Sequence, residues 1–190
     1  MKILIAGDSF AADWSLKYSK VVGWPNMLAK SHSVTNVAQA GVSEYKILKQ
    51  IESIDLFNFD AVIVSHTCFS RVHTYRHPTL SRDVLHSNCD LIISDVFNKK
   101  EVNESMQAAW GYFKYHWDET YYRDLYNIFR DKIDKRLMTV QKSIQINNFE
   151  PIISDLSYRD LLKSHPGNIN HFNEEGNLRI FKDVLSHLRS

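Results

Sequence analysis

The sequence predicts an α/β fold, a three-layer α/β/α sandwich in which helices cover both faces of a mainly parallel sheet. Short apolar runs alternate along the chain with segments whose apolar residues recur at helical spacing, which is typical of parallel strands joined by helices. The length of 190 residues suits one compact domain. No repeat, low-complexity tract or linker divides the chain, so we expect residues 1–190 to form a single domain, with a candidate lid or insertion around residues 68–117.

Three strands are predicted in the first half of the chain, with helices between them. The strands comprise residues 2–6, 33–38 and 60–64. After the first strand, the spacing predicts one broken or two short helices that carry Trp14, Leu16, Val21, Pro25, Met27 and Leu28. Ser43 can cap the next helix, whose predicted buried stripe consists of Tyr45, Ile47, Leu48 and Ile51.

The second half of the chain is less regular. Residues 67–117 show no sustained period, and residues 90–94 within them fit either a short strand or a part of the lid. From Asp118 onwards the pattern predicts a long helix, with one apolar face formed by Tyr121, Leu125, Ile128, Phe129, Ile133, Leu137, Val140 and Ile144. Residues 151–154 predict another strand. Asn173 can cap the final helix, whose expected core residues are Leu178, Phe181, Val184, Leu185 and Leu188.

Composition excludes several classes of protein. The chain has 23 Lys and Arg against 22 Asp and Glu, so it lacks the basic excess that drives nucleic-acid binding. The N-terminal apolar run is too short for a signal peptide or a membrane span, and we expect a cytoplasmic protein without a membrane partner. Cys68 and Cys89 are too few for a disulfide framework or a Cys-rich zinc site and are interpreted as free thiols.

A serine and a histidine stand at the boundaries of predicted elements. Gly7-Asp8-Ser9 follows the first strand, and His171 comes just before the final helix. A strand that ends in a tight glycine turn presents the next side chain at the sheet edge, where substrates of α/β folds bind. A serine hydroxyl needs a base, and a neutral imidazole is the usual one. Ser9 and His171 are therefore the predicted nucleophile and base.

Three blocks of the chain resemble the SGNH hydrolases, also called the GDSL esterase family. They are Gly7-Asp8-Ser9 with residues 23–28, residues 34–43 with Gly41, and His171 with Asn173 and Gly176. The resemblance implies a flavodoxin-like sheet of four or five strands. It also implies that Ser9 attacks an acyl carbonyl, that His171 takes the proton, and that the amides of Ser9 and Gly41 form an oxyanion hole.

Two positions depart from the pattern of that family. Asn168 stands where the family has an aspartate, so His171 is oriented either by the Asn168 amide or by another group such as Asp155. No asparagine follows the third strand, where the family has its third oxyanion donor. Thr67 is the expected replacement, and Ser70 and His66 are the other candidates.

The loop after the third strand is rich in cationic and imidazole side chains, namely Arg71, His73, Arg76 and His77. This loop either binds an anionic group of a substrate or is a solvated surface segment. The spacing of His73 and His77 allows a zinc site on a helix, but Pro78 disfavours a helix there, and we expect no metal and no cofactor. An aromatic run either stacks on a sugar or packs a lid onto the core; it consists of Trp110, Tyr112, Phe113, Tyr115 and Trp117.

Taken together, these patterns predict a serine esterase whose partner is a small-molecule or glycan ester, such as an O-acylated carbohydrate or a small acyl ester. Two alternatives use the same pocket. One is a catalytically weak or inactive relative that binds a glycan or another ligand, and the other is an acyltransferase that passes the acyl group to an acceptor other than water. An activated serine separates the first alternative from an enzyme.

Overall fold

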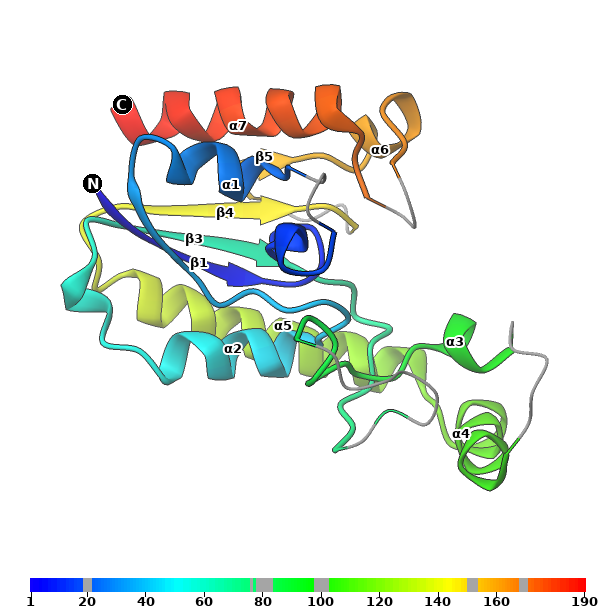
Figure 1. Ribbon diagram of the computed structural model, residues 1–190. Helices are drawn as coiled ribbons and strands as arrows, with labels where there is room; N and C mark the ends of the chain where they lie inside the picture. The colour runs from blue at the N-terminus through cyan, green and yellow to red at the C-terminus, as the bar shows by residue number, and fades with distance from the viewer. Residues whose placement is uncertain (19–21, 76, 78–83, 98–102, 150–153, 168–170) are drawn as a thin grey trace.

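A computed structural model describes residues 1–18, 22–75, 77, 84–97, 103–149, 154–167 and 171–190. In this part of the chain the centre of the molecule is a five-stranded parallel sheet with the order β2-β1-β3-β4-β5 (Figure 1). The strands are β1 Lys2–Gly7, β2 Ser33–Asn36, β3 Ala61–His66, β4 Ser143–Asn147 and β5 Leu156–Ser157. The predicted α/β class and the flavodoxin-like strand order are confirmed.

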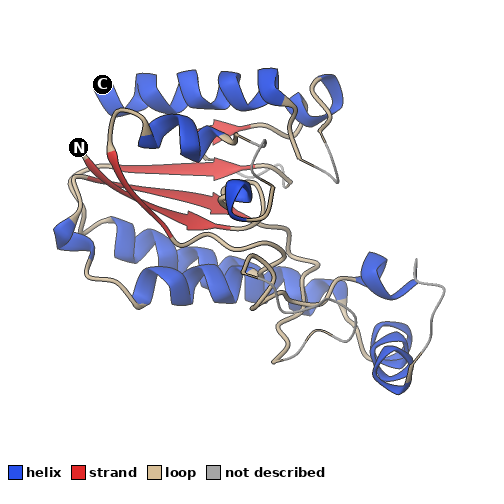
Figure 2. Ribbon diagram, in the orientation of Figure 1, coloured by secondary structure: helices blue, strands red, loops and turns tan. Residues whose placement is uncertain are grey.

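Two helical layers enclose the sheet, as Figures 1 and 2 show. On one face lie α1 Trp24–Ala29 and α7 Glu174–Arg189, and on the other lie α2 Glu44–Glu52 and α5 Glu119–Leu137. Alternate residues of β1 serve the two layers. Ile3 and Ile5 pack in the cluster that contains α1 and α7, whereas Leu4 and Ala6 pack against α2 and α5. Both faces of the central strands are therefore buried, which explains their continuous apolar sequence.

The remaining described elements are short or lie outside the two main layers. They are the 3-10 helices η1 Trp14–Leu16 and η2 Leu56–Asn58, and the helices α3 Ile93–Phe97, α4 Glu104–Tyr115 and α6 Leu161–Ser164. Helices α3 and α4 lie beside the sandwich in Figure 1 and have a small apolar cluster of their own, which includes Val96, Met106 and Phe113. No helix among the described residues is long and apolar enough to cross a lipid bilayer.

The end of the long helix was predicted wrongly. Helix α5 stops at Leu137, and Ile144 belongs to strand β4 rather than to the helix. Ile144 is buried in the sheet, beside Ile63 of β3. The error arose because Ile144 falls seven residues after Leu137, a spacing that fits two helical turns as well as a new strand.

Several smaller predictions also differ from the structure. Residues 90–94 form no strand; Leu91 makes an isolated bridge to Val72, and Ile93 begins α3. Tyr45 is half-buried, and three residues expected to face the core are exposed, namely Tyr121, Ile128 and Leu178. In the predicted strand 151–154, residues 151–153 lie outside the described part of the chain, and the observed strand β5 starts at Leu156.

Candidate active site

The turn that carries Ser9 begins with a glycine that the sheet requires. Gly7 ends β1 with a φ of 151°, and a Cβ at this position would lie 2.6 Å from the carbonyl oxygen of Ser65 on β3. The next carboxylate closes the turn, because Asp8 Oδ1 accepts a hydrogen bond from the Phe10 amide at 3.0 Å. Ser9 follows at the carboxyl edge of the sheet, 9% exposed. This is the edge at which open α/β folds bind ligands.

Trp14 connects Ser9 with His171. The indole Nε1 of Trp14 donates a hydrogen bond to the Ser9 carbonyl oxygen at 2.7 Å, and the Trp14 ring centroid lies 4.5 Å from that of His171. Phe10, the neighbour of Ser9, also contacts the imidazole, with ring centroids 5.3 Å apart. Trp14 thus contacts both the Ser9 backbone and the His171 ring, which come from opposite ends of the sequence.

The backbone around His171 is fixed from both sides. The Gly167 amide donates a hydrogen bond to the His171 carbonyl, and a Cβ on Gly167 would lie 2.3 Å from that oxygen. Asn173 caps α7, as predicted, through its side-chain oxygen on the Gly176 amide at 2.9 Å. Asn177 Nδ2 donates to the Phe172 carbonyl, and Phe172 is buried in the core. The histidine is half-buried and lies two residues before the cap of α7.

Gly41 has a backbone conformation that favours glycine, with a φ of 74°. Its carbonyl oxygen accepts hydrogen bonds from the Asp90 amide at 2.8 Å and from Arg71 Nη1 at 3.2 Å. A Cβ on Gly41 would lie 2.2 Å from Cys89 Sγ. The conformation and the close contact both exclude a side chain at this position.

A buried polar cluster lies behind the Ser9 turn. Glu44 Oε1 lies 2.5 Å from His66 Nδ1, and Glu44 Oε2 accepts a hydrogen bond from the Thr67 amide at 3.3 Å. His66 Nε2 lies 2.8 Å from Gln145 Oε1. The Thr67 amide is therefore engaged by Glu44, and only the buried Thr67 hydroxyl is left for a role at the oxyanion. This hydroxyl lies close enough to the Asp8 carboxyl to lower the pKa of that group.

Asp8 is fully buried beside Ser9, and its second carboxyl oxygen has no hydrogen-bond partner among the described residues. Burial raises the pKa of Asp8 to about 7, against the opposing effect of the nearby Arg71 guanidinium. The carboxyl is consequently protonated in part of the molecules at neutral pH. Its bond to the Phe10 amide gives Asp8 a structural role in the turn.

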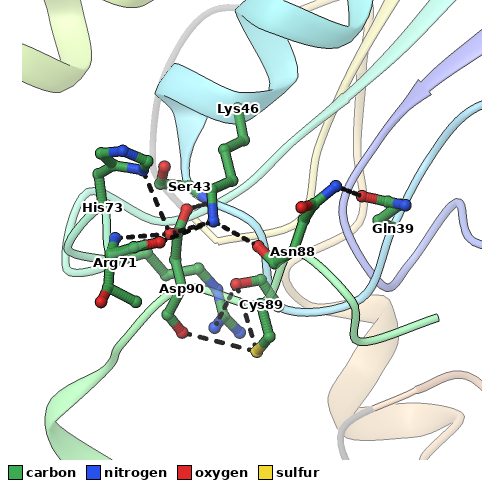
Figure 3. Close-up of polar contacts among 10 residues, drawn as sticks. Gln39, Ser43, Lys46, Arg71, His73, Asn88, Cys89 and Asp90 are labelled. Carbon is green, nitrogen blue, oxygen red and sulfur yellow. Dashed lines mark hydrogen bonds and ion pairs between the residues drawn. The ribbon is translucent and has the colours of Figure 1, made fainter. Parts of the chain in front are cut away.

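The histidines of the loop after β3, for which we considered binding of an anionic group, contact two different carboxylates of the protein. Asp90 is fully buried, and Lys46 Nζ lies 2.7 Å and His73 Nδ1 3.4 Å from its Oδ1 atom (Figure 3). His77 Nε2 lies 3.2 Å from Asp95 Oδ2 instead, so His73 and His77 face different carboxylates. Arg76 lies outside the described residues, and the described part of the chain contains no group of three ligands suited to a metal ion.

Asn168 and Asp155 were the two residues expected to orient His171, and the structure describes only Asp155. Asn168 lies outside the described residues. The Asp155 side chain is exposed and accepts a hydrogen bond from the Gln145 amide at 2.7 Å, just before β5 begins.

Sequence reasoning missed several residues of this region. Trp14 was interpreted only as part of a helical stripe, and Glu44 was not singled out at all. Asn148 was missed because β4 was absorbed into the preceding helix; its Nδ2 donates to Ser65 Oγ at 3.1 Å, and the residue is 3% exposed. An asparagine directly after a predicted buried strand would have been the signal for Asn148.

Comparisons with known proteins give the following results. No protein-family model matches the chain, and no curated protein matches it. The psychrotrophic esterase EstA from Pseudoalteromonas sp., solved in a form inhibited by monoethylphosphonate, is 13% identical, with a TM-score of 0.46 over 99% of this chain and 96% of its own. An extracellular lipase from Streptomyces rimosus is 14% identical, with a TM-score of 0.37 over 97% of this chain and 71% of its own. Identities and scores this low assign no activity, so the function has to be argued from the site itself.

Proposed function

We propose that this chain is a serine hydrolase of the SGNH type that cleaves an ester, with Ser9 as the nucleophile and His171 as the base. The observation that carries the proposal is the position of Trp14, which bonds to the Ser9 carbonyl and packs against the His171 ring. This position supports the proposal because it links the turn after β1, at the carboxyl edge of the sheet, to the imidazole that precedes α7.

In the proposed reaction, Ser9 Oγ attacks the acyl carbon while His171 takes the hydroxyl proton. The amides of Ser9 and Gly41 stabilise the oxyanion, and the Thr67 hydroxyl is the proposed third donor. Collapse of the intermediate expels the alcohol, which receives the proton from His171. Water, activated by the same imidazole, then attacks the acyl-enzyme and releases the acid and free Ser9. No cofactor enters this scheme.

A fluorophosphonate probe tests the proposal, because it forms a stable adduct only with an activated serine. Intact-mass measurement should show one adduct per chain, which Ser9→Ala abolishes and His171→Ala slows strongly. Ser15→Ala is the matched control, since Ser15 is exposed, lies six residues away and bonds to Asp13. A wild-type chain without an adduct, or with an adduct on another serine, would remove the hydrolase proposal.

For the substrate we propose an O-acylated carbohydrate or a small acyl ester. A screen of acyl esters with and without sugar acceptors separates the reactions: hydrolysis releases free acid in both conditions, whereas acyl transfer gives an acylated sugar only when an acceptor is present.

A ligand-binding protein with weak catalysis is the second candidate, and the engaged Thr67 amide favours it. Loss of one oxyanion donor typically lowers the rate about 100- to 1000-fold. Slow but Ser9-dependent fluorophosphonate labelling, combined with esterase activity near background, is the result that this candidate predicts.

A further inference from the structure

A pocket of about 270 Å³ lies between the N-terminal parts of α2 and α5, on the face of the sheet opposite α7. Its walls are largely aromatic and are formed by Tyr45, Phe69, Tyr121, Tyr122 and Phe129. Such a volume is near the lower end of the range for ligand pockets and suits a ligand with one ring and a short chain. Neither Ser9 nor His171 lines this pocket.

Two polar groups in the pocket wall have no hydrogen-bond partner among the described residues. Ser43 is 3% exposed and stands at the N-cap position of α2, but its hydroxyl makes no capping hydrogen bond. Arg71 uses Nη1 on the Gly41 carbonyl, whereas its buried Nε has no acceptor. Buried polar groups are normally satisfied, so these two residues of the pocket lining each retain a donor for an additional acceptor.

The charge of Arg71 is not neutralised by direct contact. Glu44, which also lines the pocket, is bonded to His66 and to the Thr67 amide. Asp90 is occupied by Lys46 and by the Ser43 amide. In the part of the chain that the structure describes, no ion pair of Arg71 is found. The carboxyl on which its charge acts is Asp8, and burial raises the pKa of Asp8 to about 7, so this group neutralises the guanidinium only in part.

We propose that this pocket is a second ligand site, which binds a small carboxylate with an aromatic or aliphatic body. The carboxylate accepts hydrogen bonds from Arg71 and Ser43, and the apolar body contacts the aromatic walls. A neutral molecule of the same shape contacts the walls but leaves the guanidinium unpaired. The proposal is independent of the reaction at Ser9.

Calorimetric titration of the Ser9→Ala variant tests the proposal without any turnover. The probes are 3-phenylpropionate and its neutral counterpart 3-phenyl-1-propanol. We expect the carboxylate to bind at least about tenfold more tightly than the alcohol. Arg71→Gln should remove this preference. Arg123→Gln is the matched control, because it removes a guanidinium stacked 3.9 Å from the Phe69 ring centroid, and should change the affinity less than about twofold.

Cysteine protection then locates the bound probe. Cys68 is half-buried and lines the pocket, whereas Cys89 is buried and burial raises the pKa of its thiol to about 11. Iodoacetamide should therefore modify Cys68 first, and 3-phenylpropionate should slow that reaction in proportion to its occupancy. Leu125→Trp, which fills the pocket from α5, should abolish binding of both probes and still unfold cooperatively.

Three results would overturn the second site: no binding of the carboxylate, equal binding of the alcohol, or binding without protection of Cys68. Failure of the hydrolase proposal has a different readout, the absence of a fluorophosphonate adduct on Ser9. If Arg71→Gln fails to fold, the comparison of the two probes and the protection of Cys68 still decide the question in the Ser9→Ala protein.

Discussion

Glu44 Oε1 lies 2.5 Å from His66 Nδ1, and both side chains are almost completely buried. The pair joins the first turn of α2 to the end of β3, and Glu44 also holds the Thr67 amide. One carboxylate therefore fixes the loop that leaves the sheet beside the Ser9 turn. Neither residue would be buried without the other, because an unpaired charge or a lone polar group in the core is costly.

Removal of one member of this pair should destabilise the protein strongly. We expect Glu44→Ala to lower the free energy of unfolding by about 3–5 kcal/mol, since it leaves His66 Nδ1 and the Thr67 amide buried without an acceptor. Denaturant unfolding measures the change. Glu119→Ala, which breaks an exposed pair with Arg123 at 2.9 Å, is the control and should cost less than about 1 kcal/mol. Equal losses for the two variants would contradict the prediction.

Asp8 should make stability depend on pH. Its folded-state pKa is raised to about 7 from an ordinary value of 3.8, so between these pH values the folded protein holds a proton that the unfolded chain releases. Stability from this group is therefore present at pH 4 and is lost as the pH rises towards 7. Asp8→Asn, which keeps an acceptor for the Phe10 amide, should exceed the wild type in Tm at pH 8 and approach it at pH 4.

Asp55→Asn is the control for that experiment. Asp55 is exposed and makes the same type of turn, accepting a hydrogen bond from the Phe57 amide two residues on. A gain in Tm at pH 8 that is as large for Asp55→Asn as for Asp8→Asn would show that burial of Asp8 is not the cause.

Most of the sheet could be predicted because a strand that is buried on both faces needs apolar residues at successive positions, and such a run is visible in the sequence. Strand β1 and the first four residues of β3 are continuous apolar runs. Polar residues follow β1 directly, whereas β3 continues through Ser65 and His66. Strand β4 alternates polar and apolar residues soon after a helix, and its residue Ile144 also fits the helical spacing. The predicted helix was therefore continued into the strand. Strand β5 has two residues, too few for any periodicity.

The candidate site was predicted in part for the same reason. Ser9, Gly41 and His171 stand at element boundaries with glycine or capping signals, which are local. The contact of Trp14 with His171 and the pairing of Glu44 with His66 join segments that are distant in the sequence, and no local pattern encodes where such segments meet. The pocket beside Arg71 depends on α5, whose N-terminal tyrosines were assigned only to a helical stripe.

Gly41 should not tolerate a side chain. Gly41→Ala places a Cβ 2.2 Å from Cys89 Sγ at a φ of 74°, so we expect a loss of stability of about 2 kcal/mol or more. The double variant with Cys89→Ala relieves the contact and should recover part of the loss, because only the backbone strain remains. Thermal unfolding checks both variants. Gly111→Ala is the control: it lies in α4 with open space around it and should be neutral or stabilising.

Asn168 should contribute little to catalysis, because we propose that Ser9 and His171 act as a dyad. We expect Asn168→Ala to lower kcat by less than about tenfold, compared with near-complete loss for Ser9→Ala or His171→Ala. In a serine protease, replacing the triad aspartate by asparagine costs about 10,000-fold because the imidazole takes the wrong tautomer. If Asn168→Asp raises kcat by several orders of magnitude, the native chain has a triad that lacks its aspartate, and the ligand-binding candidate is favoured.

Trp14 should set the rate at which Ser9 reacts. Trp14→Phe retains an aromatic ring against His171 but removes the indole donor from the Ser9 carbonyl, so the Ser9 turn loses one of its restraints. We expect fluorophosphonate labelling to slow about tenfold in Trp14→Phe and about 100-fold in Trp14→Ala, because small displacements of a nucleophile lower rates by such factors.

Trp110→Phe is the control for this experiment, since Trp110 lies on α4 against Phe97 and Lys114. Its labelling rate should match that of the wild type within about twofold. Circular dichroism at the labelling temperature verifies that each variant is folded, so a slower reaction reports on the site. If Trp14→Phe labels as fast as Trp110→Phe, the hydrogen bond to Ser9 has no part in positioning the nucleophile, and the ring contact with His171 alone must hold the two residues together.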